Sequence, residues 1–207
     1  VTLTNVPCYA ALLDQRIDVP GIGTVELDVG YGGAFFAIVD ARRFGFDIVV
    51  GEARRMVEIG EAIKAAADEQ LSVQHPGTPA FNKIVFTEFV LPIETVDGEP
   101  TGRNTVVISP GKLDRSPCGT GTCARMAVMH AKGELGVGDG FVSRSVINSR
   151  FDGRIESETT LSDATSAILP SIKGRAWISD FHNYVPDPKD PWPEGYSLSD
   201  TWYRALE

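Results

Sequence analysis

The segment from Thr122 to Ala131, with the sequence TCARMAVMHA, is predicted to be a helix that is apolar on nearly every side. A helix on the surface of a globular protein normally has one apolar stripe and one polar face, so a helix without a polar face is expected to be buried. In a chain of 207 residues, the other elements must then surround this helix. This requirement constrains the fold more than any other feature of the sequence.

The rest of the chain is predicted to be mainly strands. Alternating or continuous apolar patterns indicate strands over 24–29, 34–39, 81–91, 104–109, 141–147, 154–158, 167–172 and 176–178. An amphipathic helix is predicted over 52–70, with Met56, Ile59 and Ile63 on its apolar face. Beyond Pro186 the chain is rich in Pro and Gly and is expected to lie extended over a surface. Many strands and few helices, one of them buried, indicate an α+β fold.

Charge and cysteine usage exclude several classes of protein. The net charge is −9 and no run of Lys or Arg stands out, which argues against nucleic acid or an anionic membrane as a partner. The three cysteines, Cys8, Cys118 and Cys123, cannot all pair, and none has CxxC spacing or a nearby pair of histidines, so neither a disulfide framework nor a zinc site is indicated. No apolar run has membrane-spanning length and no leader is recognised. We therefore expect a cytoplasmic protein in a reducing environment.

The segment 114–122, with the sequence DRSPCGTGT, carries the candidate site. Cys118 follows a loop that ends in Pro and precedes the buried helix, and a thiol at that position meets the positive end of the helix dipole, which favours the thiolate. The free N–H groups of Gly119 and Thr120 form an anion site. In the alternative interpretation Cys118 is a small buried hydrophobe, Asp114 is a turn residue, and Gly119 and Thr120 only begin the helix.

This segment and its helix resemble the second catalytic motif of the proline racemase family, which includes proline racemases, 4-hydroxyproline epimerases and trans-3-hydroxyproline dehydratases. The resemblance extends over essentially the whole chain. Further segments that resemble the family are NVP at 5–7, DVGYGGAFF at 28–36, GRAWI at 174–178, DPKDP at 187–191 and GY at 195–196.

The resemblance implies a particular fold. Members of the family have two similar domains, each a diaminopimelate-epimerase-like half-barrel in which a sheet wraps around a central helix. Residues 8–168 would form the second domain, and residues 1–7 and 169–207 would pack on a first domain that lies outside this sequence.

The resemblance also implies an activity. Family epimerases and racemases invert the α-carbon of 4-hydroxyproline or proline without metal or cofactor, using two thiols on opposite faces of the carbon. Cys118 would be one of these thiols, and Asp114 would contact the ring nitrogen of the imino acid. Gly119 and Thr120 would hold its carboxylate through their N–H groups.

Other candidate residues are weaker. Cys123 lies about 140° further round the helix than Cys118 and is expected in the core. His130, inside the apolar helix, is expected to be a core or carbonyl-bonded histidine. Cys8 lacks the Gly-His-Gly that accompanies the first catalytic thiol of the family. A cysteine hydrolase would need an activating His, and no His has a spacing that recommends it.

The first catalytic motif of the family, Cys or Ser followed by Gly-His-Gly-Thr, does not occur in this sequence. Inversion needs acid/base groups on both faces of the carbon, so we expect a fragment that is inactive alone. A separate first-domain chain or a homodimer could supply the other half, or the chain could be a non-catalytic remnant or binding domain. Cysteine at position 118 favours an epimerase or racemase, since the family's dehydratases tend to carry threonine there.

Overall fold

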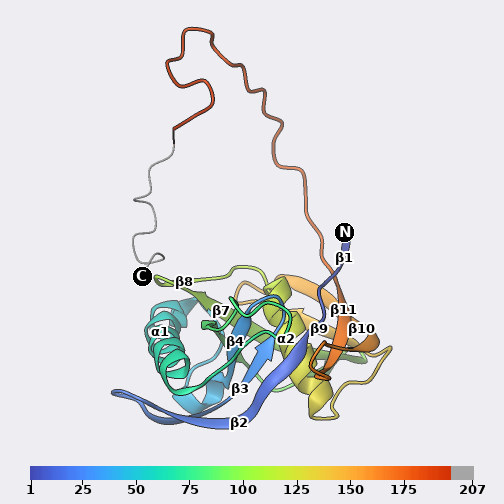
Figure 1. Ribbon diagram of the computed structural model, residues 1–207. Helices are drawn as coiled ribbons and strands as arrows, with labels where there is room; N and C mark the ends of the chain where they lie inside the picture. Colours follow the sequence, from blue (N-terminus) through green and yellow to red (C-terminus); the bar gives the residue numbers. More distant parts are fainter. Residues whose placement is uncertain (197–207) are drawn as a thin grey trace. The chain divides into compact units, whose positions relative to one another are not determined.

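The computed structural model describes residues 1–196. It divides into a compact unit from Val1 to Arg175 and a second unit that begins at Ala176. The first unit contains all the helices and strands described below (Figure 1). The described part of the second unit, 176–196, has turns but no helix or strand, so the strand predicted over 176–178 is wrong. Trp177 and Ile178 are largely exposed there and lack the buried face that a paired strand would give them.

The first unit is built on a large mixed sheet. Its order is β1-β11-β10-β9-β7-β5-β4-β3-β2, with β6 and β8 paired to β7. Neighbouring strands are antiparallel except for the parallel pairs β4–β5 and β7–β9. The strands are β1 (Thr2–Thr4), β2 (Tyr9–Val19), β3 (Gly23–Tyr31), β4 (Phe35–Asp40), β5 (Ile84–Val90), β6 (Glu94–Val96), β7 (Glu99–Ile108), β8 (Lys112–Leu113), β9 (Gly140–Arg144), β10 (Arg150–Thr160) and β11 (Ser166–Lys173).

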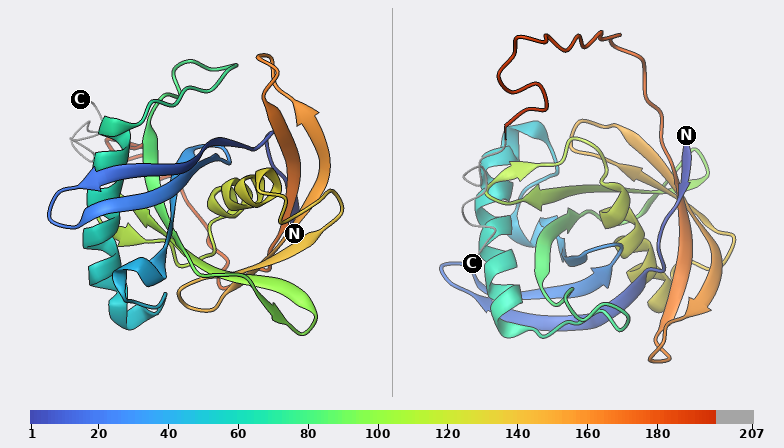
Figure 2. Two further views of the ribbon diagram at one scale, coloured as in Figure 1. Left: turned by 90° about the horizontal axis from the view of Figure 1, so that it is seen from below. Right: turned by 45° about the horizontal axis from the view of Figure 1, so that its top comes forward.

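The sheet curls until its two ends meet. Cys8, directly before β2, exchanges two backbone hydrogen bonds of 2.8 Å with Ile168 of β11. Shifts of register in β2 and β10 mark bulges, which bend strands and increase their twist. The strands therefore surround helix α2 (Gly119–Ala131), as Figure 2 shows. This arrangement confirms the predicted α+β fold with a sheet wrapped around a central helix.

Helix α2 is buried because its side chains are apolar all round. Every residue from Gly121 to Met129 is buried, and Met126 and Cys123 pack in one cluster with residues of β9, β10 and β11. Each fully buried side chain of the size of Met contributes about 1.5–3 kcal/mol. Arg125 is the one charged residue in this stretch, and it donates to the carbonyls of Leu91 (2.6 Å) and Arg103 (3.2 Å).

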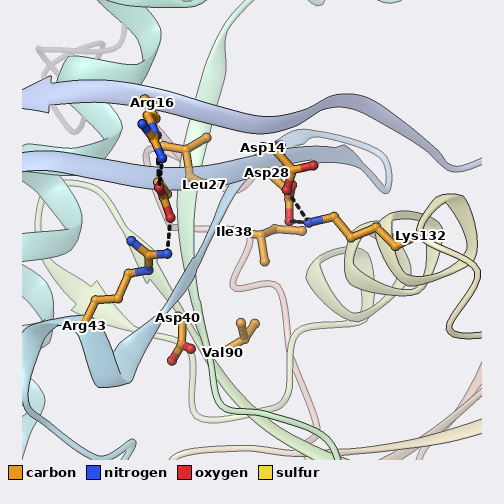
Figure 3. Close-up of a pocket in the computed structure, with 10 residues that line it drawn as sticks. Asp14, Arg16, Leu27, Asp28, Ile38, Asp40, Arg43, Val90 and Lys132 are labelled. Carbon is orange, nitrogen blue, oxygen red and sulfur yellow. Dashed lines mark hydrogen bonds and ion pairs between the residues drawn. The ribbon is translucent and has the colours of Figure 1, made fainter.

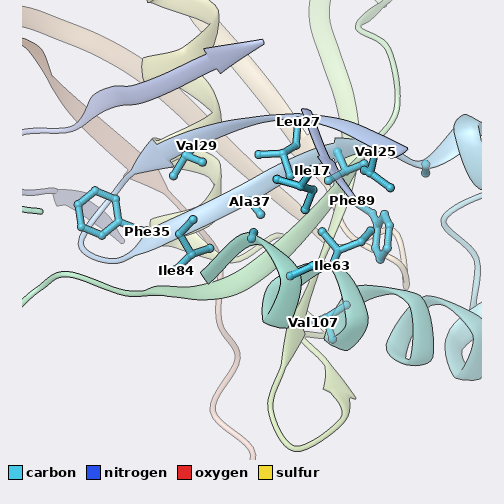
Figure 4. Packing of buried hydrophobic residues seen from close by; sticks show 14 of the residues in the cluster. Ile17, Val25, Leu27, Val29, Phe35, Ala37, Ile63, Ile84, Phe89 and Val107 are labelled. Carbon is cyan, nitrogen blue, oxygen red and sulfur yellow. The ribbon is translucent and has the colours of Figure 1, made fainter. Parts of the chain in front are cut away.

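A second core lies between the sheet and helix α1 (Ala53–Gln70). Met56 and Ile63 of α1 are fully buried, whereas Ile59 is half-buried, so the amphipathic helix predicted over 52–70 is confirmed. Figure 4 shows Ile63 among Phe89 and Val107 of the sheet. Two short 3-10 helices, η1 (Ala41–Phe44) and η2 (Val50–Glu52), connect β4 to α1.

Strand β2 was not predicted from the sequence, although it is one of the two longest strands. Its alternation is interrupted because the register shifts between Ala10 and Leu12 and again before Gln15, and Asp14 takes a φ of 53°. At the other end of the sheet, β1 pairs with β11 inside the first unit. The domain limits at residues 8 and 168, and the packing of the flanking segments on another domain, stay predictions.

Candidate functional site

Cys118 is the N-cap residue of α2, and its backbone is held in an unusual conformation. Its φ of 62° lies in the left-handed region, which residues other than Gly seldom adopt. The N–H of Cys118 donates to the Ser116 hydroxyl (3.0 Å), and its carbonyl accepts from the N–H of Thr122 (2.9 Å). The carbonyl of Pro117 accepts from the Asn104 amide (2.7 Å) and the Thr122 hydroxyl (3.1 Å). A strained backbone conformation persists only where the surrounding hydrogen bonds and packing hold it in place, and such conformations are common at functional sites.

The structure brings the four predicted site residues together. Asp114, Cys118, Gly119 and Thr120 are all partly exposed, so a small molecule can reach them. Asp114 Oδ1 accepts from the N–H (2.9 Å) and the hydroxyl (3.0 Å) of Ser116, so this carboxylate also orders the loop. The N–H groups of Gly119 and Thr120 belong to the first turn of α2, where no preceding turn provides acceptors.

The thiol of Cys118 is favoured over the thiolate. Burial raises the pKa of Cys118 to about 12, and the charges of Glu88 and Asp114 act in the same direction. The Thr120 hydroxyl, 3.5 Å from Sγ, and the N–H of Gly121, which donates to Sγ at 3.4 Å, oppose this rise without overcoming it. The helix terminus favours the thiolate, as expected, through the N–H of Gly121, but desolvation outweighs this effect.

A buried carboxyl group behind Cys118 escaped the sequence analysis. Glu88 lies in β5 with no exposure, and its Oε1 accepts from the Asn104 amide at 2.7 Å. Asn104 Oδ1 in turn accepts from the Ser143 hydroxyl at 2.7 Å. Burial raises the pKa of Glu88 to about 7, against the opposing effects of Arg125 and Asn104. The only signal in the sequence was a glutamate inside an otherwise largely apolar strand.

The glycines of the DVGYGG segment hold α2 close to the sheet. A Cβ on Gly32 would lie 2.0 Å from the Thr120 carbonyl oxygen, and one on Gly30 would lie 2.7 Å from that of Ala124. Both clashes would be with backbone atoms, so no change of side-chain rotamer could remove them. The absence of side chains at these glycines lets α2 approach the sheet directly behind the site.

The remaining cysteines and His130 lie away from the site loop. Cys8 and Cys123 are fully buried in one apolar cluster, as expected for core residues. A hydrogen bond with Cys123 and burial raise the pKa of Cys8. His130 Nδ1 lies 2.8 Å from the Leu135 carbonyl oxygen, which confirms the carbonyl-bonded interpretation.

A charged hollow of about 380 Å³ lies elsewhere, between β2, β3, β4 and the end of α2 (Figure 3). Its charges pair with each other: Glu26 bridges Arg16 and Arg43, and Lys132 contacts Asp14 at 2.9 Å and Asp28 at 2.8 Å. Because these ion pairs satisfy the charges, we assign no ligand to the hollow.

Residues 1–196 contain no cluster of three or more His, Cys, Asp or Glu side chains that could hold a metal ion. Neither described helix has both the length and the apolar character needed to cross a membrane.

Comparison with known proteins gives consistent matches. A family model described as proline racemase matches residues 1–197. A hydroxyproline epimerase from Agrobacterium vitis, crystallised with bound trans-4-hydroxy-L-proline, is 38% identical with a TM-score of 0.80 over 97% of this chain. A probable proline racemase from Agrobacterium radiobacter K84, crystallised with bound carbonate, is 37% identical with a TM-score of 0.80, also over 97% of this chain. The present chain covers only 56% and 58% of those two chains, little more than half of their length.

Proposed function

This chain belongs to the proline racemase family, and we propose that it supplies one half of the active site of an amino-acid epimerase or racemase. The observation that carries the proposal is the conformation of Cys118. Its thiol is partly exposed at the first turn of α2, and a network of hydrogen bonds holds its strained backbone beside free N–H groups. Strained, over-determined positions of this kind suit a group that must be placed accurately against a substrate.

In the proposed reaction Cys118 acts as a general acid on one face of the α-carbon. A base on the opposite face removes the α-proton, the C–H electron pair moves toward the carboxylate, and the Cys118 S–H bond breaks as a new C–H bond forms. A raised pKa keeps Cys118 protonated near pH 7, as a proton donor requires. The thiolate left behind has the N–H of Gly121 within 3.4 Å.

The neighbouring groups have complementary roles in this proposal. The N–H groups of Gly119 and Thr120 would bind the substrate carboxylate, where negative charge accumulates as the proton leaves. Asp114 would attract the positively charged imino nitrogen. The second acid/base group would come from a first domain, a separate chain or a second copy of this chain. No metal or cofactor enters the proposal.

We propose 4-hydroxyproline or proline as the substrate. This choice is supported by the structural neighbours, one of them a hydroxyproline epimerase with trans-4-hydroxy-L-proline bound. A trans-3-hydroxyproline dehydratase remains the alternative within the family, although the cysteine at position 118 favours inversion. A cytoplasmic location, indicated by cysteine usage alone, stays a prediction.

The proposal is tested by restoring the missing half. The chain would be fused to, or co-expressed with, the first domain of a family epimerase and assayed by chiral chromatography on trans-4-hydroxy-L-proline and L-proline. We expect no turnover from the 207-residue chain alone, turnover from the restored protein, and none after Cys118→Ala. Cys123→Ala, which removes a buried thiol of the same helix, is the matched control and should retain turnover. Full activity in restored Cys118→Ala would overturn the assignment.

A further inference from the structure

Glu88 has a buried oxygen that is left without a hydrogen bond. Within residues 1–196, Oε1 of this carboxyl group is satisfied by Asn104, whereas Oε2 is buried and has no partner. Native proteins rarely leave a buried polar atom unpaired, because the lost hydration costs about 1–3 kcal/mol. An exception inside a well-packed barrel therefore calls for a functional explanation.

The unpaired oxygen and the sulfur of Cys118 both lie beside Gly121. A Cβ added to Gly121 would lie 3.3 Å from Glu88 Oε2 and 3.3 Å from Cys118 Sγ. The two atoms thus both border Gly121 at the first turn of α2, where Val106 Cγ2, 3.0 Å from the same Cβ position, leaves no room for a side chain. Glu88 approaches from the interior of the barrel, while Cys118 is partly exposed on the side from which a ligand would come.

Among the groups around Glu88, one cation, Arg125, opposes the effect of burial on its pKa. From β7 it faces Asn104, which is uncharged, and across the sheet it pairs with the apolar Ile38 and Val106. From α2 it faces Arg125, whose positive charge lowers the pKa of Glu88 and whose guanidinium donates to the backbone carbonyls of Leu91 and Arg103. The other charged groups nearby act on its neighbours: the charge of Asp114 raises the pKa of Cys118, and the charges of Glu134 and Asp40 raise the pKa of Arg125. Despite this opposing charge, ionised Glu88 raises the pKa of Cys118, in the same direction as burial.

We propose that Glu88 is a positioning residue that controls the protonation of Cys118: its carboxylate holds the thiol protonated through Oε2, and its hydrogen bond to Asn104 steadies the loop that carries the thiol. The inference rests on the proposed function only in taking Cys118 as the reacting thiol. Because the pKa of Glu88 is about 7, its charge changes within the pH range in which the protein would work. Ionised Glu88 repels a thiolate at Cys118, and protonated Glu88 does not.

If the titrations of Glu88 and Cys118 are coupled, the pH dependence of the modification rate of Cys118 in the wild-type protein should show it. The rate of thiol modification follows the fraction of thiolate, so far below the thiol pKa its logarithm rises by one unit per pH unit. If the pKa of Cys118 rises as Glu88 ionises, the slope must fall below one between about pH 6 and 8 and recover outside that range. A role of Glu88 confined to packing produces no such change of slope.

The test measures the reaction of Cys118 with methyl methanethiosulfonate in the 207-residue chain, from pH 5 to 10, with the modified cysteine identified by mass spectrometry. We expect the reduced slope in the wild type and a slope of one throughout in Glu88→Gln, with about a tenfold faster reaction at pH 8, equivalent to about one pKa unit. Glu58→Gln removes an exposed carboxylate of α1 and should match the wild type.

A slope of one throughout in the wild type would overturn the proposal, and this measurement does not depend on the folding of any variant. Equal rates at pH 8 for Glu88→Gln and Glu58→Gln would also overturn it, provided that circular dichroism shows both to be folded. Turnover is not measured, so the absence of epimerase activity would count against the proposed function and not against this coupling.

Discussion

Replacing Asn104 by Ala should destabilise the protein more than any single polar substitution on its surface. Asn104 is fully buried in β7 and makes hydrogen bonds of 2.7 Å to Glu88, Pro117 and Ser143. Alanine removes all of them and leaves the Glu88 carboxyl and the Ser143 hydroxyl without this partner. The Pro117 carbonyl keeps a second partner in the Thr122 hydroxyl at 3.1 Å.

The magnitude follows from these contacts. Each buried group that loses its only partner costs about 1–3 kcal/mol, and Pro117 costs less, so we expect a loss of about 3–6 kcal/mol in the free energy of unfolding. At about 2–4 °C per kcal/mol for a domain of this size, the melting temperature should fall by roughly 10–20 °C. This loss is a large part of the total stability of about 5–15 kcal/mol that is typical of folded proteins.

Thermal unfolding followed by far-ultraviolet circular dichroism measures the effect, with Asn82→Ala as the control. Asn82 is exposed in the loop before β5, and its replacement should change the free energy of unfolding by less than about 0.5 kcal/mol. If Asn104→Ala melted at the same temperature as Asn82→Ala, the reasoning that these hydrogen bonds hold the loop of Cys118 would be refuted.

Four further predictions concern the site and its support. Cys118 should be the cysteine that iodoacetamide labels first in the native protein, because the other two are fully buried; preferential labelling of either of those would contradict the assignment. Pyrrole-2-carboxylate, a planar mimic of a deprotonated imino acid, should protect Cys118 from alkylation once a first domain encloses the site, and unchanged labelling at saturating ligand would exclude a substrate site there. Gly32→Ala should prevent normal packing of α2, because its Cβ would lie 2.0 Å from the Thr120 carbonyl oxygen; a near-native yield and melting temperature would show that this contact relaxes easily. Folding raises the pKa of Glu88 from its ordinary 4.5 to about 7, so between these pH values the folded state binds a proton that the unfolded state has lost, and the stability of the wild type should fall as pH rises from 4.5 to 7. In urea titrations the free energy of unfolding of Glu88→Gln should therefore rise relative to that of the wild type over this interval. A difference that stays constant with pH would contradict this prediction.

Local patterns in the sequence were sufficient for several parts of the fold. An apolar helix with no polar face has to be enclosed, and the structure encloses α2 from Gly121 to Met129. The amphipathic pattern of α1 and the apolar runs of β4 and β11 were likewise enough, because periodicity depends only on neighbouring residues. Strand β2 could not be predicted, since bulges interrupt its alternation and its pairing is decided by β3, a separate segment.

Part of the candidate site could likewise be predicted from the sequence, and part could not. The motif around Cys118 was visible because its residues are consecutive, and the turn and helix start that they form are local structures. The sequence showed the helix terminus, which lowers the pKa of Cys118, but not the burial that raises it more strongly. That pKa depends on burial by the surrounding barrel and on Glu88, which lies in a different strand and is absent from any local pattern.

The sequence by itself therefore determined the family, the buried helix and the identity of the candidate thiol. Only the tertiary structure decided that burial raises the pKa of this thiol, that Glu88 Oε2 and the thiol both border Gly121, and that Asn104 fixes the loop before it. The physical reason is that desolvation and Coulomb interactions depend on distances in space. Residues 88, 104 and 118 become neighbours only when the strands close around α2.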